Sequence, residues 1–214
     1  MIKDIIFDFD GVICESLDVK AEAFYELYLP YGKDIALKVK QFHLQNGGMS
    51  RFDKFEYFES NFLNKNINRN IIIELAKKFS NIVKEKVIKA PLVEGIEDFL
   101  KNDSKKYNCF IVSATPIEEL QVIVEKKDLS KYFKEILGTP KNKIELVDYL
   151  IKRYNINTNH TLFIGDAKTD FLTAKEHKIN FILRETKDNY NIFDNDMFKI
   201  KNLVDLDRII NNYF

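Results

Sequence analysis

The feature that most constrains the fold of this chain is an apolar run that leads into two carboxylates and a glycine, Ile5 to Gly11. An unbroken apolar run is typical of a strand covered on both faces, as in a parallel sheet flanked by helices. Side chains two residues apart share one face of extended backbone, so Asp8 and Asp10 would project together from the strand end, where such sheets bind ligands. Neighbouring carboxylates repel each other unless a cation joins them, which favours Mg²⁺ and oxygen chemistry.

Composition excludes several classes of protein. The chain has 214 residues, and its 33 Lys and Arg balance its 33 Asp and Glu, so nothing indicates binding to nucleic acid or an anionic membrane. Cys14 and Cys109 form no metal-binding spacing, and we expect reduced packing residues. Neither a signal peptide nor an apolar run of membrane-spanning length is recognisable, so we expect a cytoplasmic protein.

Helical periodicity dominates the residues that follow the acid pair. Apolar stripes with helical spacing fall at residues 24–31, 55–62 and 72–83. About seventy residues pass without a clear strand, which far exceeds an ordinary strand-to-helix connection. We therefore predict that a helical cap is inserted directly after the first strand.

The loop between the first two of these stripes carries residues that could meet a substrate. Gly48 marks the turn, and Ser50 can cap the helix that follows. A helix start that also carries Arg51 and Lys54 would suit an anionic group of a substrate. The alternative is a solvated helix start with ordinary surface charges. Arg51, Lys54 and the nearby His43 are therefore candidates only.

A strand-and-helix pattern returns after Pro91. The apolar strand Cys109 to Val112 leads into Ser113 and Ala114, and helical spacing follows. The Ser113 hydroxyl and the free backbone N–H groups beside it could bind a phosphate, although a plain helix cap has the same sequence pattern.

Two later turns carry further charged candidates. Lys143 begins a helix, where the helix dipole disfavours a cation; a bound phosphate would explain it, and a solvated lysine is the alternative. The buried strand at residues 161–164 ends in a glycine and Asp166, and Asp170 follows in the same loop. Right-handed crossovers place the ends of parallel strands at one edge of a sheet, so these groups can meet the acid pair.

In this order the motifs resemble those of the haloacid dehalogenase superfamily. They are Asp8-x-Asp10-Gly-Val, the strand-end Ser113, Lys143, and Gly165-Asp166-x-x-x-Asp170. The helical insertion is similar to the cap of the phosphoglycolate phosphatase and β-phosphoglucomutase branch, and the resemblance covers nearly the whole chain. It implies an α/β fold, with a Rossmann-like parallel sheet core flanked by helices. The core domain would comprise residues 1–14 and 89–214, and the all-helical cap domain residues 15–88.

The resemblance also implies a role for each residue of these motifs. Asp8 would be the nucleophile and form an aspartyl-phosphate, and Asp10 would be the general acid and base. Ser113 and Ala114 would bind the phosphoryl group, and Lys143 would neutralise it.

Mg²⁺ is the cofactor that the resemblance implies. Asp8, the Asp10 backbone carbonyl and Asp166 would hold the ion, and Asp170 would support it directly or through water. A phosphate dianion approaches several carboxylates only where a metal ion and a lysine offset the repulsion. Phosphoryl transfer otherwise depends mostly on positioning and charge stabilisation.

Two positions depart from the family pattern or leave an alternative open. Glu15 stands where close relatives usually carry aspartate, and Lys141 competes with Lys143 for the phosphate. We favour Lys143 because the helical face begins directly after it. The substrate contacts expected from the cap are Glu15, Gly48, Ser50, Arg51 and Lys54.

We therefore expect a Mg²⁺-dependent phosphatase that acts on a small phosphorylated metabolite, a sugar phosphate or a phosphoglycolate-like acid. The carboxylate of Asp10 favours phosphate esters, because the dehalogenases and phosphonatases of the superfamily lack it. A phosphomutase of the β-phosphoglucomutase type would share the site. The alternatives of another class are a phospho-accepting signalling domain, which has no such cap, and a silent binding domain. We expect a monomer with a metabolite as its partner and with no nucleic acid or membrane partner.

Overall fold

The computed structural model describes residues 1–189, 193 and 197–214. Within these residues the strands form one sheet in the order β3-β2-β1-β4-β5-β6, and all its neighbouring strands pair in parallel. The strands are β1 (Asp4–Phe7), β2 (Asn108–Pro116), β3 (Glu135–Thr139), β4 (Thr161–Gly165), β5 (Asn180–Arg184) and β6 (Lys199–Ile200). The predicted Rossmann-like α/β fold is confirmed.

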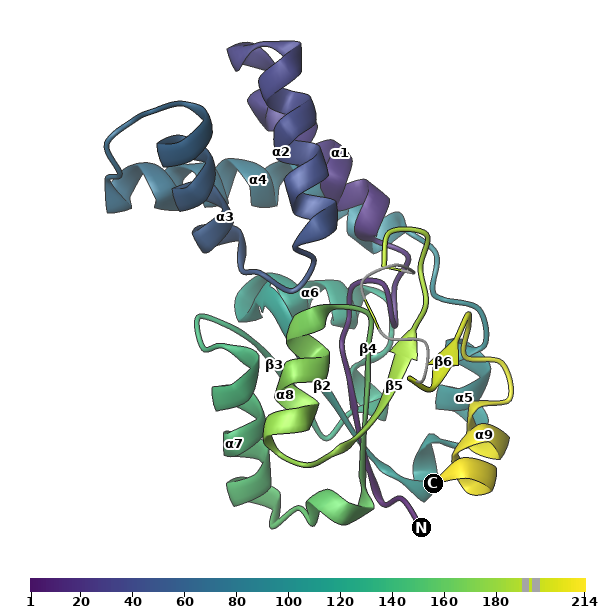
Figure 1. The fold of residues 1–214 in the computed structure, drawn as a ribbon. Helices are drawn as coiled ribbons and strands as arrows, with labels where there is room; N and C mark the ends of the chain where they lie inside the picture. The colour runs from purple at the N-terminus through teal and green to yellow at the C-terminus, as the bar shows by residue number, and fades with distance from the viewer. Residues whose placement is uncertain (190–192, 194–196) are drawn as a thin grey trace.

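Helices cover both faces of this sheet and form with it what we call the sheet lobe (Figure 1). They are α5 (Ile96–Asn102), α6 (Ile117–Lys126), α7 (Lys143–Tyr154), α8 (Lys168–Glu176) and α9 (Leu206–Tyr213). Ile6 of β1 packs into the cluster that includes α7 and α8, whereas Ile5 and Phe7 pack into the cluster that includes α5, α6 and α9. Every residue of β1 is buried, as its unbroken apolar run predicts.

Four further helices form a separate lobe above the carboxyl edge of the sheet, here called the helical lobe (Figure 1). They are α1 (Leu17–Tyr28), α2 (Lys33–Gln45), α3 (Arg51–Tyr57) and α4 (Arg69–Lys89). Aromatic rings from three of them form its core: the Phe24 ring centroid lies 4.1 Å from that of Phe79 and 5.5 Å from that of Phe55. The three predicted apolar stripes lie in α1, α3 and α4 and in the short helical turns after α1 and α3.

The structure adds elements that the sequence did not reveal. Helix α2 lacks a strong apolar stripe, because its buried residues are only Ala36, Val39 and His43. The edge strands β3 and β6 were also not predicted. Strand β2 continues past Val112 to Pro116, with a shift of register against β3. The predicted loop from Arg184 to Asp196 can be assessed only in part, because residues 190–192 and 194–196 lie outside the described residues.

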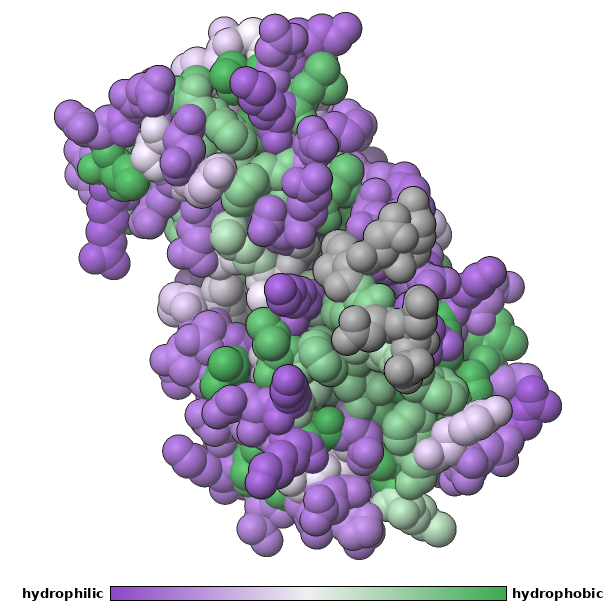
Figure 2. Space-filling view, viewed as in Figure 1, coloured by the Kyte–Doolittle hydropathy of each residue, from purple (hydrophilic) through white to green (hydrophobic). Residues whose placement is uncertain are grey.

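The candidate site lies in the space between the two lobes. The loop from α2 to α3 descends toward the carboxyl ends of the strands, and both termini lie at the opposite end of the sheet lobe (Figure 1). Figure 2 shows the narrower waist between the lobes, where apolar surface is visible. No helix in the described part of the chain has the length and apolarity that crossing a membrane requires.

Candidate active site

The ends of two central strands bring three carboxylates together. Asp8 directly follows β1, Asp166 directly follows β4, and Asp170 lies in the first turn of α8. An oxygen atom from each of the three lies within 4.8 Å of the others, and all three residues are buried. The sequence prediction that acids from distant segments meet here therefore agrees with the geometry.

Asp8 is held on both of its oxygen atoms. Its Oδ1 accepts a hydrogen bond of 2.7 Å from the Phe9 backbone N–H, and its Oδ2 lies 2.9 Å from Lys143 Nζ. Burial raises the pKa of the Asp8 carboxyl, Lys143 opposes this shift, and the neighbouring Asp170 and Asp10 add to it, which leaves a pKa of about 7. Burial and the neighbouring carboxylates thus disfavour the negative charge of Asp8.

Lys143 is the cation at the centre of the acid cluster. It also pairs with Asp170 Oδ1, while Asp170 Oδ2 accepts a hydrogen bond of 3.0 Å from the Ala167 backbone N–H. Burial alone would lower the pKa of Lys143, but Asp170 and Asp8 outweigh burial and raise it, so the ammonium stays charged. Lys141 is exposed instead, with its Nζ 5.7 Å from the centroid of the Tyr149 ring.

The three carboxylates suit a divalent cation. Mg²⁺ prefers carboxylate oxygen ligands. Burial and the nearby Asp8 and Asp170 raise the pKa of Asp166 well above its ordinary value, and a bound cation would offset that repulsion. Gly11 has a φ of 76°, and a Cβ there would lie 2.5 Å from Asp166 Oδ2, so this glycine lets the carboxylate approach the backbone closely. Asp166 is the best placed ligand of the three, because both oxygens of Asp8 and of Asp170 already have protein partners.

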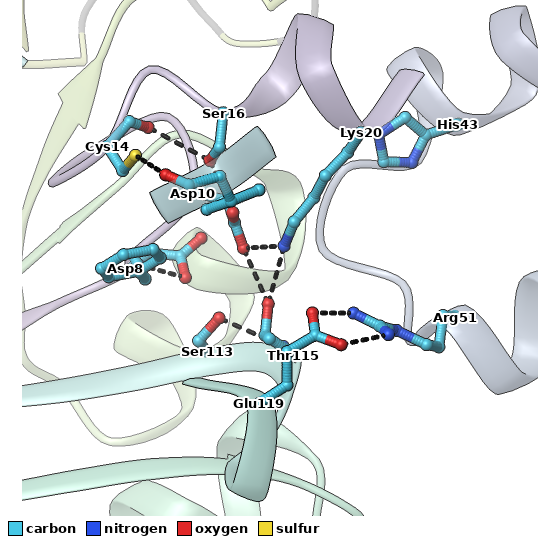
Figure 3. A network of polar contacts seen from close by, with 12 residues as sticks. Asp8, Asp10, Cys14, Ser16, Lys20, His43, Arg51, Ser113, Thr115 and Glu119 are labelled. Carbon is cyan, nitrogen blue, oxygen red and sulfur yellow. Dashed lines mark hydrogen bonds and ion pairs between the residues drawn. The ribbon is translucent and has the colours of Figure 1, made fainter. Parts of the chain in front are cut away.

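Asp10 lies beside this cluster in a hydrogen-bonded network that joins the two lobes (Figure 3). Its Oδ1 accepts from the Ser16 hydroxyl at 2.6 Å, and its Oδ2 accepts from the Thr115 hydroxyl at 2.9 Å and from Lys20 Nζ at 2.5 Å. Lys20 Nζ also donates to Thr115 Oγ1 at 2.7 Å. Burial alone would raise the pKa of Asp10, but Lys20 and the two hydroxyls lower it below its ordinary value.

Sequence reasoning missed Lys20. The available signal was its spacing, since Lys20 lies four residues before Phe24 and therefore on the buried face of α1. A lysine on an apolar helix face needs a buried partner, and Asp10 is that partner.

The expected phosphate-binding residues line a cleft between the lobes, with a volume of about 910 Å³. The sheet lobe contributes Ser113, Ala114 and Lys143 to its walls, and the helical lobe contributes Gly48 and Ser50. Ser113 does not lie at the end of β2 as predicted, because the strand continues to Pro116. Ser50 caps α3 through a hydrogen bond of 3.2 Å from the Asp53 backbone N–H.

The charged candidates of the helical lobe have different surroundings. Arg51 does not face the acid cluster: its guanidinium binds both oxygens of Glu119 in α6, at 2.7 and 2.6 Å (Figure 3). Lys54 Nζ instead lies 2.8 Å from His43 Nδ1. Glu15 pairs with Arg184 of β5. Arg51 and Glu15 thus each have an ion-pair partner, whereas Lys54 contacts His43 instead.

Comparison with known proteins gives a family match and a related phosphatase. The model of the haloacid dehalogenase-like hydrolase family matches residues 5–184. The phosphorylated carbohydrates phosphatase of Thermotoga maritima is 25% identical over 192 residues, which span 85% of this chain and 84% of that protein.

Solved structures show the same fold. A β-phosphoglucomutase from Clostridium difficile has a TM-score of 0.80 at 20% identity, over 100% of this chain and 97% of that chain. A predicted phosphoglycolate phosphatase from Haemophilus somnus has a TM-score of 0.75 at 18% identity, over 98% of both chains. The resemblance read from the motifs is confirmed, since the family match spans all of them: the chain belongs to the haloacid dehalogenase-like hydrolases.

Proposed function

We propose that this hydrolase is a Mg²⁺-dependent phosphatase that acts on a small phosphorylated metabolite, a sugar phosphate or a phosphoglycolate-like acid. One observation carries the proposal: Asp8 pairs with a buried lysine and lies close to two further carboxylates, with Asp10 nearby. Such a site can bind a phosphoryl group only if cations offset its negative charge. The Thermotoga relative, a phosphatase by its name, supports the same reaction class.

In the proposed mechanism Asp8 attacks the phosphorus atom. A bond forms between an Asp8 carboxylate oxygen and phosphorus, and the bond from phosphorus to the ester oxygen breaks. Asp10 gives a proton to the departing oxygen, then removes a proton from the water that attacks the phosphorus of the aspartyl-phosphate. Lys143 and the Ser113 hydroxyl hold the phosphoryl oxygens. Bound Mg²⁺ would supply Lewis-acid charge stabilisation between Asp8 and Asp166.

The contact between Lys20 and Asp10 fits the second of these steps. Lys20 favours the ionised form of Asp10, which is the form that accepts a proton from water. The first step needs Asp10 protonated, so the pair must loosen when the substrate binds. We propose that residues 15–88 form a cap that opens and closes over the core of residues 1–14 and 89–214, which would couple substrate entry to this change.

A phosphate-release screen over metabolite phosphates tests the proposal. The protein is assayed with Mg²⁺ and with a chelator, and the Asp8→Asn variant serves as the control. We expect steady release of inorganic phosphate that needs Mg²⁺ and that Asp8→Asn abolishes while its circular dichroism is unchanged. Conversion of a hexose phosphate into its isomer without steady release would assign a phosphomutase instead. Release that persists in Asp8→Asn would contradict the mechanism.

A further inference from the structure

Apart from the large cleft, a small cavity between the lobes is lined by Asp10. Its volume is about 40 Å³, and its polar walls are Asp10, Lys20, His43, Arg51, Lys54 and Thr115. Asp10 is the residue proposed to protonate the departing ester oxygen, so the leaving group of the substrate must lie against Asp10. This inner cavity is therefore where the leaving group would bind.

Two of the three cations around the inner cavity already have a carboxylate partner. Lys20 pairs with Asp10 at 2.5 Å, and Arg51 pairs with Glu119 at 2.6 Å. Ser80 also donates a hydrogen bond of 2.5 Å to Glu119, which fixes the Arg51 pair further. The planar guanidinium of Arg51 could bind a phosphate dianion through two parallel hydrogen bonds, but here it binds the Glu119 carboxylate instead.

Lys54 is the remaining cation, and its surroundings differ. Its exposed fraction is 2%, and no carboxylate of the described residues lies within 4.0 Å of its Nζ. In its charged form Lys54 only donates hydrogen bonds, so His43 Nδ1 then accepts from it and His43 carries its own proton on Nε2. Burial and the neighbouring cations, Lys54 first among them, lower the pKa of His43 well below its ordinary value, so His43 is neutral. The inner cavity thus holds a buried lysine with no carboxylate partner among the described residues. Burial and Lys20 lower the pKa of Lys54 to about 7, so an anion beside it would favour the charged form.

Burying a charge without a partner is costly, and an anionic ligand would remove that cost. We propose that Lys54, held in place by His43, receives a compact anionic group, a carboxylate, on the leaving group of the substrate. The inference rests on the proposed phosphatase function and narrows its substrate class to short phosphorylated acids. A cavity of this size has room for roughly one to three water molecules, which suits a compact group such as a carboxylate.

A matched pair of esters tests the role of Lys54. In 2-phosphoglycolate the carbon next to the ester carbon is a carboxylate, whereas in 2-hydroxyethyl phosphate it is an uncharged alcohol. We expect the wild type to prefer the acid in kcat/KM, and Lys54→Met to lower kcat/KM for the acid about 100-fold while changing the value for the alcohol by less than about threefold. Lys78→Met, which removes an exposed lysine of α4, is the control and leaves both values unchanged.

The outcomes separate this inference from the proposed function. An equal loss for both esters in Lys54→Met would mean that Lys54 has only a structural role, and would overturn the inference. The inference would also be overturned by a wild type that releases phosphate from p-nitrophenyl phosphate in an Asp8-dependent manner but does not prefer 2-phosphoglycolate to 2-hydroxyethyl phosphate. Failure of every ester would contradict the phosphatase proposal itself. Calorimetry with 2-phosphoglycolate gives a second test of Lys54. We expect this acid to bind Asp8→Asn more tightly than the Asp8→Asn/Lys54→Met double variant. Equal binding would overturn the inference.

Discussion

At the scale of single residues, the protein keeps a buried acid ionised by placing a lysine from the other lobe against it. Asp10 accepts hydrogen bonds from Ser16, Lys20 and Thr115, and Lys20 contributes the largest opposition to the burial that would raise its pKa. The carboxylate comes from the sheet lobe and the ammonium from α1 of the helical lobe. The ionisation state of Asp10 therefore depends on the contact between the two lobes.

Lys20→Met tests this link. Without the ammonium, burial dominates and the pKa of Asp10 rises, so Asp10 loses its ionised form at a higher pH. We expect the acid limb of the kcat profile to move upward by about 1 to 3 pH units, together with a lower maximal kcat. Lys38→Met removes an exposed lysine of α2 and keeps the wild-type profile. An unmoved acid limb in Lys20→Met would show that Lys20 does not control Asp10.

At the scale of elements, the loop between α2 and α3 sits tightly against the start of α8. A Cβ on Gly48 would lie 1.6 Å from Thr169 Oγ1, whereas a Cβ on Gly47 would lie 3.7 Å from Ala167 Cβ, an ordinary contact. The lobes can thus approach each other closely at Gly48 only because this residue lacks a side chain.

The two glycines provide a matched pair of variants. We expect Gly48→Ala to push the loop away from α8 and to lower kcat/KM about 100-fold, the loss that a displacement of about 1 Å can cause. Gly47→Ala should keep nearly full activity. The measurement is kcat/KM for both variants, with circular dichroism to verify folding. Equal activities would rule out a close fit at Gly48.

A buried ion pair also joins α3 to α6. Burial alone would raise the pKa of Glu119, but Arg51 and Ser80 lower it below the ordinary glutamate value of 4.5. A group whose folded pKa is lowered stabilises the fold above its unfolded pKa, and that stability is lost as the pH falls through the folded pKa. The Arg51–Glu119 pair should therefore hold the lobes together at neutral pH and weaken in acid.

Denaturant unfolding of three variants tests this pair. Arg51→Met leaves the Glu119 carboxylate buried alone and should cost about 3 to 5 kcal/mol at pH 7. The Arg51→Met/Glu119→Met double variant should cost much less, because no unpaired charge remains. The deficit of Arg51→Met should already shrink as the pH falls toward 4.5, because without Arg51 burial raises the pKa of Glu119 and the lone carboxyl then takes up a proton. A deficit that does not change with pH would refute the assignment.

At the scale of the whole molecule, the central strands and the acid cluster were predictable because each contributing strand end has a local signal in the sequence. Each strand end carries its own signal, an apolar run followed by a charged or hydroxyl residue, and parallel topology brings Asp8 and Asp166 to one edge. The contacts between lobes were not predictable, because they depend on how α1 and α3 are oriented. The partners of Lys20 and Arg51 come from segments 95 and 68 residues away, at Thr115 and Glu119.

Helix α2 and strand β3 escaped prediction for a different reason. Both lie at the periphery, where few residues need to be apolar: α2 buries three residues, and β3 is an edge strand with only its last two residues buried. Burial is the source of the periodic signal, so weakly buried elements leave little trace in the sequence.

Repulsion within the acid cluster predicts that Mg²⁺ changes the stability of the whole fold. Burial and Asp8 raise the pKa of Asp166, which means that its negative charge destabilises the metal-free fold at neutral pH. We expect Mg²⁺ to stabilise the wild type, by about 2.7 kcal/mol at a concentration 100 times the dissociation constant. Asp166→Asn should be at least as stable as the wild type in a chelator and should lose the response to Mg²⁺.

Thermal unfolding with Mg²⁺ and with a chelator measures this response. Asp98→Asn, which neutralises an exposed acid of α5, should respond to Mg²⁺ like the wild type. A full Mg²⁺ response in Asp166→Asn would place the metal elsewhere.

The central claim is that Asp8 takes up the phosphoryl group, and peptide mass spectrometry of acid-quenched enzyme tests it most directly. Trypsin releases residues 4–20 as one peptide, because Lys3 and Lys20 flank it. During turnover of a phosphorylated substrate we predict a phosphate on this peptide, located at Asp8 by fragmentation and absent from Asp8→Asn. Sustained phosphate release without any label on that peptide, or with the label on another residue, would contradict the account.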